Sequence, residues 1–97
     1  MITVRTSPHS VSCEGHSGYA ESGSDIVCAA VTSAMRFADA QLRALSVEPA
    51  VEMDEGRAYI RISSDRPEAE PVFRAFAQLM REFEEEYPKF IRMARRA

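Results

Sequence analysis

Two residues near the start of the chain have the types and the spacing for nucleophilic catalysis. Cys28 falls in the first turn or so of a predicted helix, and His16 ends a predicted strand before it. The positive end of a helix dipole favours a thiolate, which is the reactive form of cysteine. The segment between the two residues is long enough to fold back. The sequence therefore permits a dyad with Cys28 as nucleophile and His16 as general base.

The same residues also have other interpretations. Cysteine is common as a small buried residue, so Cys28 could be part of a core. A metal site would have to use His9, Cys13, His16 and Cys28. That spacing matches no familiar zinc module, and Cys13 and His16 should point to opposite faces of an extended strand. We therefore expect no metal and no cofactor.

The elements before the helix are predicted to be two short strands. Residues 2–5 and 10–14 are β-prone runs, and the Ser-Pro-His segment at residues 7–9 favours a turn between them. Val11 and Cys13 alternate with polar residues, so Cys13 is expected to face the core.

A loop is predicted at residues 17–24, which hold two glycines and three serines. Gly18 and Gly23 could let it move as a lid over a substrate, or it could be a merely disordered connection. A helical stripe of apolar residues then runs from about residue 25 to about residue 45. Either Ser24 or Asp25 can cap its first amides.

A second hairpin and a second helix follow. Residues 50–54 and 57–63 are β-prone and are joined by Glu55 and Gly56, where glycine can supply a positive φ. A helix is then expected between Pro67 and Pro88. The order is ββαββα. It predicts one α+β domain over residues 1–97, in two layers, with a largely antiparallel four-stranded sheet covered by two helices.

The net charge and the length of the chain indicate which partners and which cellular compartment to expect. With 12 Lys and Arg against 15 Asp and Glu, the net charge is −3, which argues against a basic face for nucleic acid. No run approaches the roughly 18 apolar residues of a membrane helix, and the first residues contain no signal-peptide core. We expect a cytoplasmic chain with reduced cysteines. Because so short a chain buries a small core, dimerisation would supplement it.

The motif around the two candidate residues resembles the ribosomal-processing cysteine protease family, Prp. The resemblance is carried by GHSGYA at residues 15–20 and GSDIVCAAV at residues 23–31. It extends to the second hairpin and to EYPKFI at residues 86–91, so it covers nearly the whole chain.

The resemblance implies a cytoplasmic, homodimeric endopeptidase that removes the N-terminal extension of large-subunit ribosomal protein twenty-seven during ribosome assembly. It implies Cys28 as the nucleophile and His16 as the general base, with Gly15 as part of the motif. Family substrates have bulky apolar residues before the cut, which implies an apolar pocket near the loop. Tyr19, with Gly18 and Gly23, is expected to help form that pocket, although Tyr19 could instead anchor the loop against the sheet.

Asp25 and Thr32 are candidate supporting residues. Asp25 matches the acidic position of the family motif, and we favour a helix cap over a hydrogen bond across the site. Thr32 stands where the family often has serine, and Ser17 where it often has alanine. Thr32 lies one helical turn after Cys28, so its hydroxyl could orient a catalytic group. The alternative to the protease is a non-catalytic ribosome-assembly or protein-binding module with the same fold.

Overall fold

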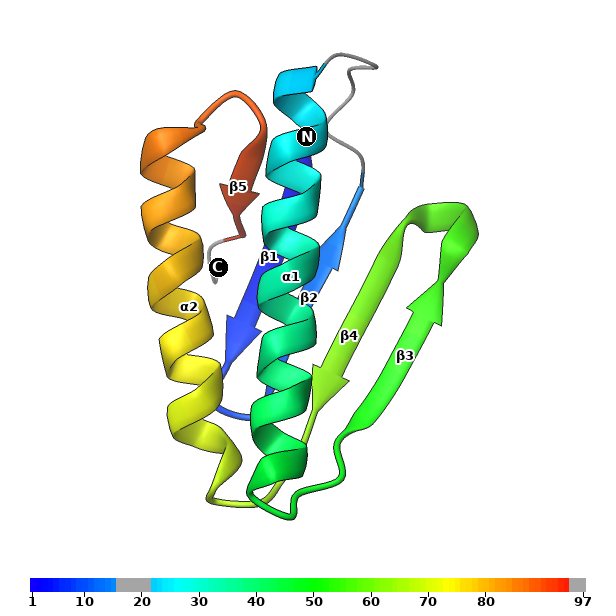
Figure 1. Cartoon of the computed structure of the whole chain (residues 1–97), viewed down its shortest axis with the longest axis vertical. Coiled ribbons are helices and arrows are strands. Elements are labelled where there is room, and N and C mark those ends of the chain that lie inside the picture. The colour runs from blue at the N-terminus through cyan, green and yellow to red at the C-terminus, as the bar shows by residue number, and fades with distance from the viewer. Residues whose placement is uncertain (16–21, 95–97) are drawn as a thin grey trace.

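The protein folds into one sheet with two helices on one face (Figure 1). The computed structural model describes residues 1–15 and 22–94, with side chains in the first helix from residue 26 onward. The strands are β1 (Ile2–Ser7), β2 (Ser10–Glu14), β3 (Ala50–Asp54), β4 (Tyr59–Ser63) and β5 (Ile91–Met93), and the helices are α1 (Ser22–Ala44) and α2 (Ala69–Glu86). The predicted α+β class is confirmed, but the predicted ββαββα order and four-stranded sheet lack one strand, because β5 follows α2 and makes the sheet five-stranded.

The two hairpins join through their inner strands. The sheet order is β3-β4-β2-β1-β5, and β2 pairs antiparallel with both β1 and β4. Cys13 is therefore opposite Val4 on one side and Ile60 on the other. All pairs are antiparallel except β1 with β5. One continuous sheet thus connects the start of the chain to the second hairpin.

The core lies between the sheet and the helices. Strand alternation turns one set of apolar residues toward the helices, while α1 and α2 each bury one stripe. The fully or nearly fully buried residues include Val4, Val11, Cys13, Ile62, Val27, Val31, Met35, Leu42, Phe73, Phe76 and Met80. The side of α1 and the helix-facing side of the β3–β4 hairpin are less well covered, because the hairpin extends beyond α1 (Figure 1).

The fifth strand was not predicted from the sequence. β5 pairs in parallel with β1, placing Ile91 opposite Ile2, and Ile91 is completely buried. The amide of Ile2 donates to the carbonyl of Phe90 at 2.8 Å. Three residues are too few to show an alternating pattern, so only the pairing with β1 identifies them as a strand.

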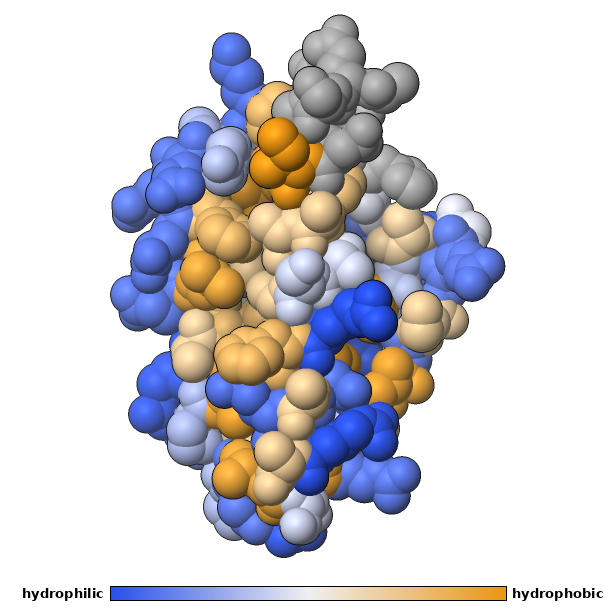
Figure 2. Space-filling model, viewed as in Figure 1, coloured by the Kyte–Doolittle hydropathy of each residue, from blue (hydrophilic) through white to orange (hydrophobic). Residues whose placement is uncertain are grey.

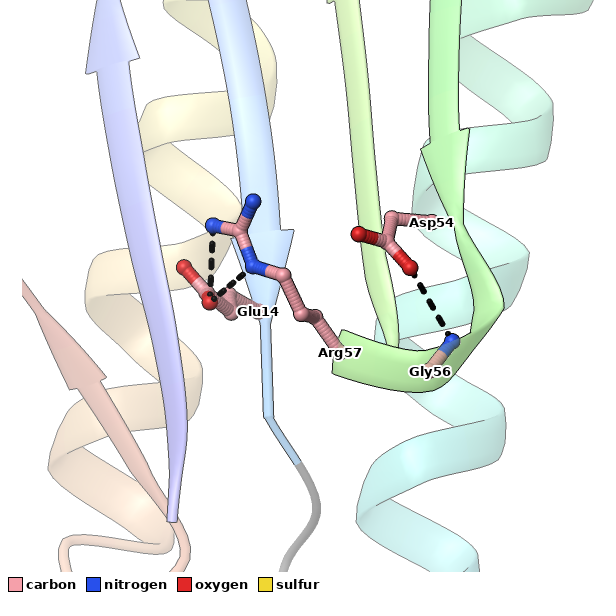
Figure 3. Close-up of polar contacts among 4 residues, drawn as sticks. All are labelled: Glu14, Asp54, Gly56 and Arg57. Carbon is pink, nitrogen blue, oxygen red and sulfur yellow. Dashed lines mark hydrogen bonds and ion pairs between the residues drawn. The ribbon is translucent and has the colours of Figure 1, made fainter.

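The turn of the second hairpin also differs from the prediction. Glu55–Arg57 form a turn of 3-10 helix, and the positive φ of 49° belongs to Ala58 rather than to Gly56. The Asp54 carboxylate accepts a hydrogen bond from the Gly56 amide at 3.1 Å (Figure 3). This side-chain cap gives the turn a local hydrogen bond, so the turn does not need a left-handed glycine.

Helix α1 begins at Ser22, before the start expected at about residue 25. Gly23, Ser24 and Asp25 therefore lie inside its first turn rather than in the loop or at the cap position. The first backbone amides of a helix make no hydrogen bond within it, so the first turn depends little on the helix propensity of its residues. A Ser-Gly-Ser segment can therefore begin a helix. Within the described residues, neither helix combines the length and the apolar character needed to cross a membrane.

Candidate active site

Cys28 lies on the wall of a cavity of about 400 Å³ between α1 and the second hairpin. The lining comes from three parts of the fold: the start of β1 with the end of β2, one side of α1, and the β3–β4 hairpin with its turn. The lining residues are Ile2, Cys13, Gly15, Cys28, Val31, Thr32, Met35, Arg36, Met53, Asp54, Glu55, Ala58, Tyr59 and Ile60. Most of these side chains are apolar, so the cavity offers a hydrophobic surface beside a thiol.

Cys28 lies further from the start of its helix than the sequence predicted. Because α1 begins at Ser22, Cys28 lies in the second turn rather than the first. The backbone amides without intrahelical partners belong to the first turn, before Cys28. Helical side chains lean toward the helix N-terminus, so the half-buried Cys28 still leans toward that turn. The dipole acts on its sulfur over a longer distance than expected.

Two supporting residues named from the sequence lie in the same cavity wall. Thr32 is one turn after Cys28 on α1 and, like Gly15 at the end of β2, lines the cavity. Gly15 has a φ of 102°, and its amide donates to the carbonyl of Ala58 at 3.2 Å. A β-carbon at Gly15 would lie 2.6 Å from the Met1 carbonyl oxygen. Glycine at this position therefore avoids both a strained φ and a close contact with the Met1 carbonyl.

Other predicted site residues lie outside the described part of the chain. They are His16, Gly18 and Tyr19, and the side chain of Asp25 is not described either. The dyad of Cys28 with His16 and the pocket role of Tyr19 therefore stay predictions. Gly23, expected in the loop, is in the first turn of α1.

The second cysteine contrasts with Cys28. Cys13 is 5% exposed and faces the core, as predicted. Burial raises the pKa of the Cys13 thiol from 9.0 to about 12, so this sulfur stays protonated at neutral pH. Neither cysteine forms a disulfide. Cys13 therefore lines the cavity as a neutral, apolar thiol.

The end of β2 is connected to the hairpin turn by an ion pair (Figure 3). Glu14 accepts two hydrogen bonds from the Arg57 guanidinium, at 3.1 Å from Nε and 3.0 Å from Nη2. The Arg57 guanidinium also stacks over the Tyr59 ring, 4.8 Å from its centre. Both partners of the ion pair are exposed, so its contribution to stability is small. Its effect is to hold the turn beside Gly15.

The possible metal ligands do not gather in the described residues. His9 is exposed in the β1–β2 turn, at the other end of β2 from Gly15. Across residues 1–15 and 22–94, no three His, Cys, Asp or Glu residues are placed to hold a metal ion.

Sequence reasoning missed the contribution of the second hairpin and of Arg36 to the cavity. Met53 is 67% exposed and lines the cavity from the edge strand β3. Arg36 follows Cys28 and Thr32 at four-residue intervals, and that helical spacing could have identified it. No comparable local signal marks Met53, because its place depends on the pairing of β3 with β4.

The comparisons with known proteins point to one family. The family model "Cysteine protease Prp" matches residues 1–92. The S. aureus ribosomal processing protease Prp in complex with a covalently linked product peptide is 26% identical, with a TM-score of 0.78 over 96% of this chain and 97% of that chain. The protein SMU.848 from Streptococcus mutans is 29% identical, with a TM-score of 0.78 over 95% of this chain and 89% of that chain.

A second S. aureus Prp structure, in complex with a substrate peptide, shares the fold at 22% identity, with a TM-score of 0.77 over 96% of this chain and 95% of that chain. No curated protein matches the chain at a significant level. Because the family model spans almost all of the chain, the chain belongs to the Prp family of cysteine proteases.

Proposed function

We propose that the chain is the endopeptidase that removes the N-terminal extension of large-subunit ribosomal protein twenty-seven during ribosome assembly. The observation that carries this proposal is the place of Cys28, a half-buried thiol on the wall of a mainly apolar cavity. A related protein of S. aureus is a ribosomal processing protease that forms a covalent link with its product peptide. A thiol beside an apolar cavity fits a precursor with bulky apolar residues before the cut.

The reaction would proceed through an acyl-enzyme. His16 takes the proton of the Cys28 thiol, and the thiolate attacks the scissile carbonyl carbon. The protonated His16 then gives its proton to the leaving amine, and the C–N bond breaks. Water, activated by His16, hydrolyses the thioester and releases the new carboxylate. Each step needs only the dyad, the peptide and water.

Supporting residues have separate roles in this proposal. Backbone amides in the first turn of α1 are the donors for the developing oxyanion, because the helix dipole favours negative charge there. Thr32, one turn after Cys28, orients a catalytic group. Asp25 now falls within the first turn of α1, where its charge suits the helix dipole even without the cap position. Tyr19, Gly18 and Gly23 belong to the substrate side of the site.

We further propose a cytoplasmic homodimer. Several large apolar side chains are exposed on the outer face of the helices: Ile26 at 61% and Phe37 at 65% on α1, and Leu79 at 37% on α2. Hydrophobic residues gather along the middle of this face, with hydrophilic residues on both flanks (Figure 2). Burial of this face against a second copy would add apolar area that a chain of this length lacks.

The direct test is cleavage of a synthetic peptide that spans the encoded start of the host's ribosomal protein twenty-seven. The wild type is expected to cut it at one bond, identified by mass spectrometry. Cys28→Ala and His16→Ala are expected to lose nearly all turnover. Cys13→Ala is the matched control, because it removes the other thiol in the cavity and should still cut.

The outcomes separate the two candidate functions. If Cys28→Ala cuts as fast as the wild type, the catalytic assignment is wrong. If the wild type binds the peptide and never cuts it, the non-catalytic binding module is supported instead.

A further inference from the structure

Arg36 lies on the wall of the cavity that contains Cys28, on the same face of α1. Cys28, Thr32 and Arg36 follow one another at four-residue spacing, and all three line the cavity. Residues four apart on a helix are neighbours on its surface. The three side chains therefore form one row along the cavity, with the thiol at one end and the guanidinium at the other.

The Arg36 guanidinium has no ion pair with any carboxylate of the described residues. The arginines that do form ion pairs are Arg43, Arg57, Arg61, Arg66 and Arg74. Arg43, further along the same helix, is held by Asp39 at 3.0 Å. Arginine carries five N–H donors and no acceptor. The donors of Arg36 are thus available to a molecule bound in the cavity.

The opposite wall carries hydrogen-bond acceptors. Asp54 and Glu55, at the end of β3 and the start of the turn, line the cavity across from α1. Within the described residues, no ion pair joins Arg36 to either of them. An extended peptide presents N–H and C=O groups along both of its edges. A donor on one wall and acceptors on the other match a peptide main chain whatever its side chains are.

We propose that Arg36 is a substrate-binding residue whose guanidinium donates a hydrogen bond to a main-chain carbonyl oxygen of the substrate peptide. This inference rests on the proposed protease function. Eight helical residues at a 1.5 Å rise separate Arg36 from Cys28 by about 12 Å. An extended peptide advances about 3.3 Å per residue, so the bound carbonyl lies roughly three or four residues from the scissile bond. Shorter peptides cannot reach Arg36.

The test is a set of peptides shortened one residue at a time on each side of the cut. For the wild type, kcat/KM is expected to rise about tenfold when the third or fourth residue on one side is added. A tenfold rise corresponds to the free energy of about one charge-assisted hydrogen bond. The rise should come from KM with kcat unchanged. It should persist when that residue is replaced by alanine, because the carbonyl remains.

Three variants isolate the role of the guanidinium. Arg36→Met should remove the length-dependent rise, and Arg36→Lys should restore part of it. Arg43→Met is the matched control, because Arg43 is on the same helix but does not line the cavity. It should behave like the wild type. Equal urea midpoints for all variants would show that the fold is intact.

Two results would overturn the inference and leave the protease function standing. One is an unchanged length-dependent rise in Arg36→Met. The other is a rise that disappears when the side chain at that position is changed to alanine. If the wild type cuts none of the peptides, the protease function itself fails and the inference fails with it.

Discussion

The α-carbon of Gly15 lies against the backbone carbonyl of Met1, so closely that a β-carbon there would be 2.6 Å from the carbonyl oxygen. The φ of 102° at Gly15 is also outside the range of other residues. Gly15→Ala is therefore expected to lower the free energy of unfolding by at least about 1–2 kcal/mol, measured by urea denaturation.

The matched control for Gly15 is the glycine in the hairpin turn. A β-carbon at Gly56 would meet only the Asp54 side chain, at 3.5 Å, which is an ordinary contact. Gly56→Ala should change the free energy of unfolding by less than about 0.5 kcal/mol. Equal losses in the two variants would contradict the steric explanation for Gly15.

The two cysteines should differ in their reaction with iodoacetamide. Cys13 is buried and its pKa of about 12 leaves roughly one thiolate in 10⁵ at pH 7. Cys28 is half-buried on the cavity wall. In the folded protein, alkylation is expected at Cys28 and not at Cys13, as read by peptide mass spectrometry. In urea, both should react, and preferential labelling of Cys13 in the folded state would refute the assignment.

Burial of Cys13 also predicts a loss of stability at alkaline pH. The thiol pKa is raised from 9.0 to about 12, so the folded state keeps a proton that the unfolded state releases. The stabilisation is complete below pH 9 and is lost as the pH rises from about 9 toward 12. Within that window the free energy of unfolding should fall steadily as the pH rises, because the unfolded state releases the proton that the folded state keeps.

Cys13→Ala is the control variant for this pH effect, because it lacks the thiol that titrates. The variant is less stable overall, since it loses buried volume. Its free energy of unfolding between pH 9 and 11 should decline less steeply than that of the wild type. Parallel declines would show that other groups cause the alkaline loss.

If the proposed homodimer forms through the outer face of the helices, a charge placed on that face should prevent dimerisation. Phe37→Asp places a charge on an exposed apolar side chain of α1 and is expected to give a monomer by sedimentation. Val51→Asp is the control, because Val51 is also exposed but lies on β3. It should leave the mass unchanged. A wild type that sediments as a monomer at all concentrations would remove the dimer from the proposal.

Much of the fold could be predicted because local patterns and tertiary structure agree. The alternation around Val11 and Cys13 and the helical stripe through Val27, Val31 and Met35 each describe a face that the structure buries. Leu45, at the predicted end of this helix, is instead 50% exposed, because α1 has ended at Ala44. Patterns of apolar residues thus identify elements better than they identify the ends of elements.

The parts that escaped prediction depend on distant residues. β5 is a strand because Ile91 pairs opposite Ile2, and nothing in its own three residues indicates that pairing. The cavity combines α1 with Met53 and Asp54, which the sheet order brings near it. Gly15 and Cys28 were predicted as site residues because they lie in the two motif segments, and Thr32 because it lies one helical turn after Cys28, whereas no residue type or spacing marked Met53 or Asp54.

The parallel pairing of β1 with β5 has a consequence for synthesis. β1 is translated before β5, its second neighbour in the sheet, which emerges from the ribosome almost ninety codons later, as the register of Ile2 with Ile91 requires. Until then, one side of β1 has no strand beside it and remains open to pairing with other nascent chains. The enzyme therefore completes its own sheet only after the hairpin and both helices between β1 and β5 have been made.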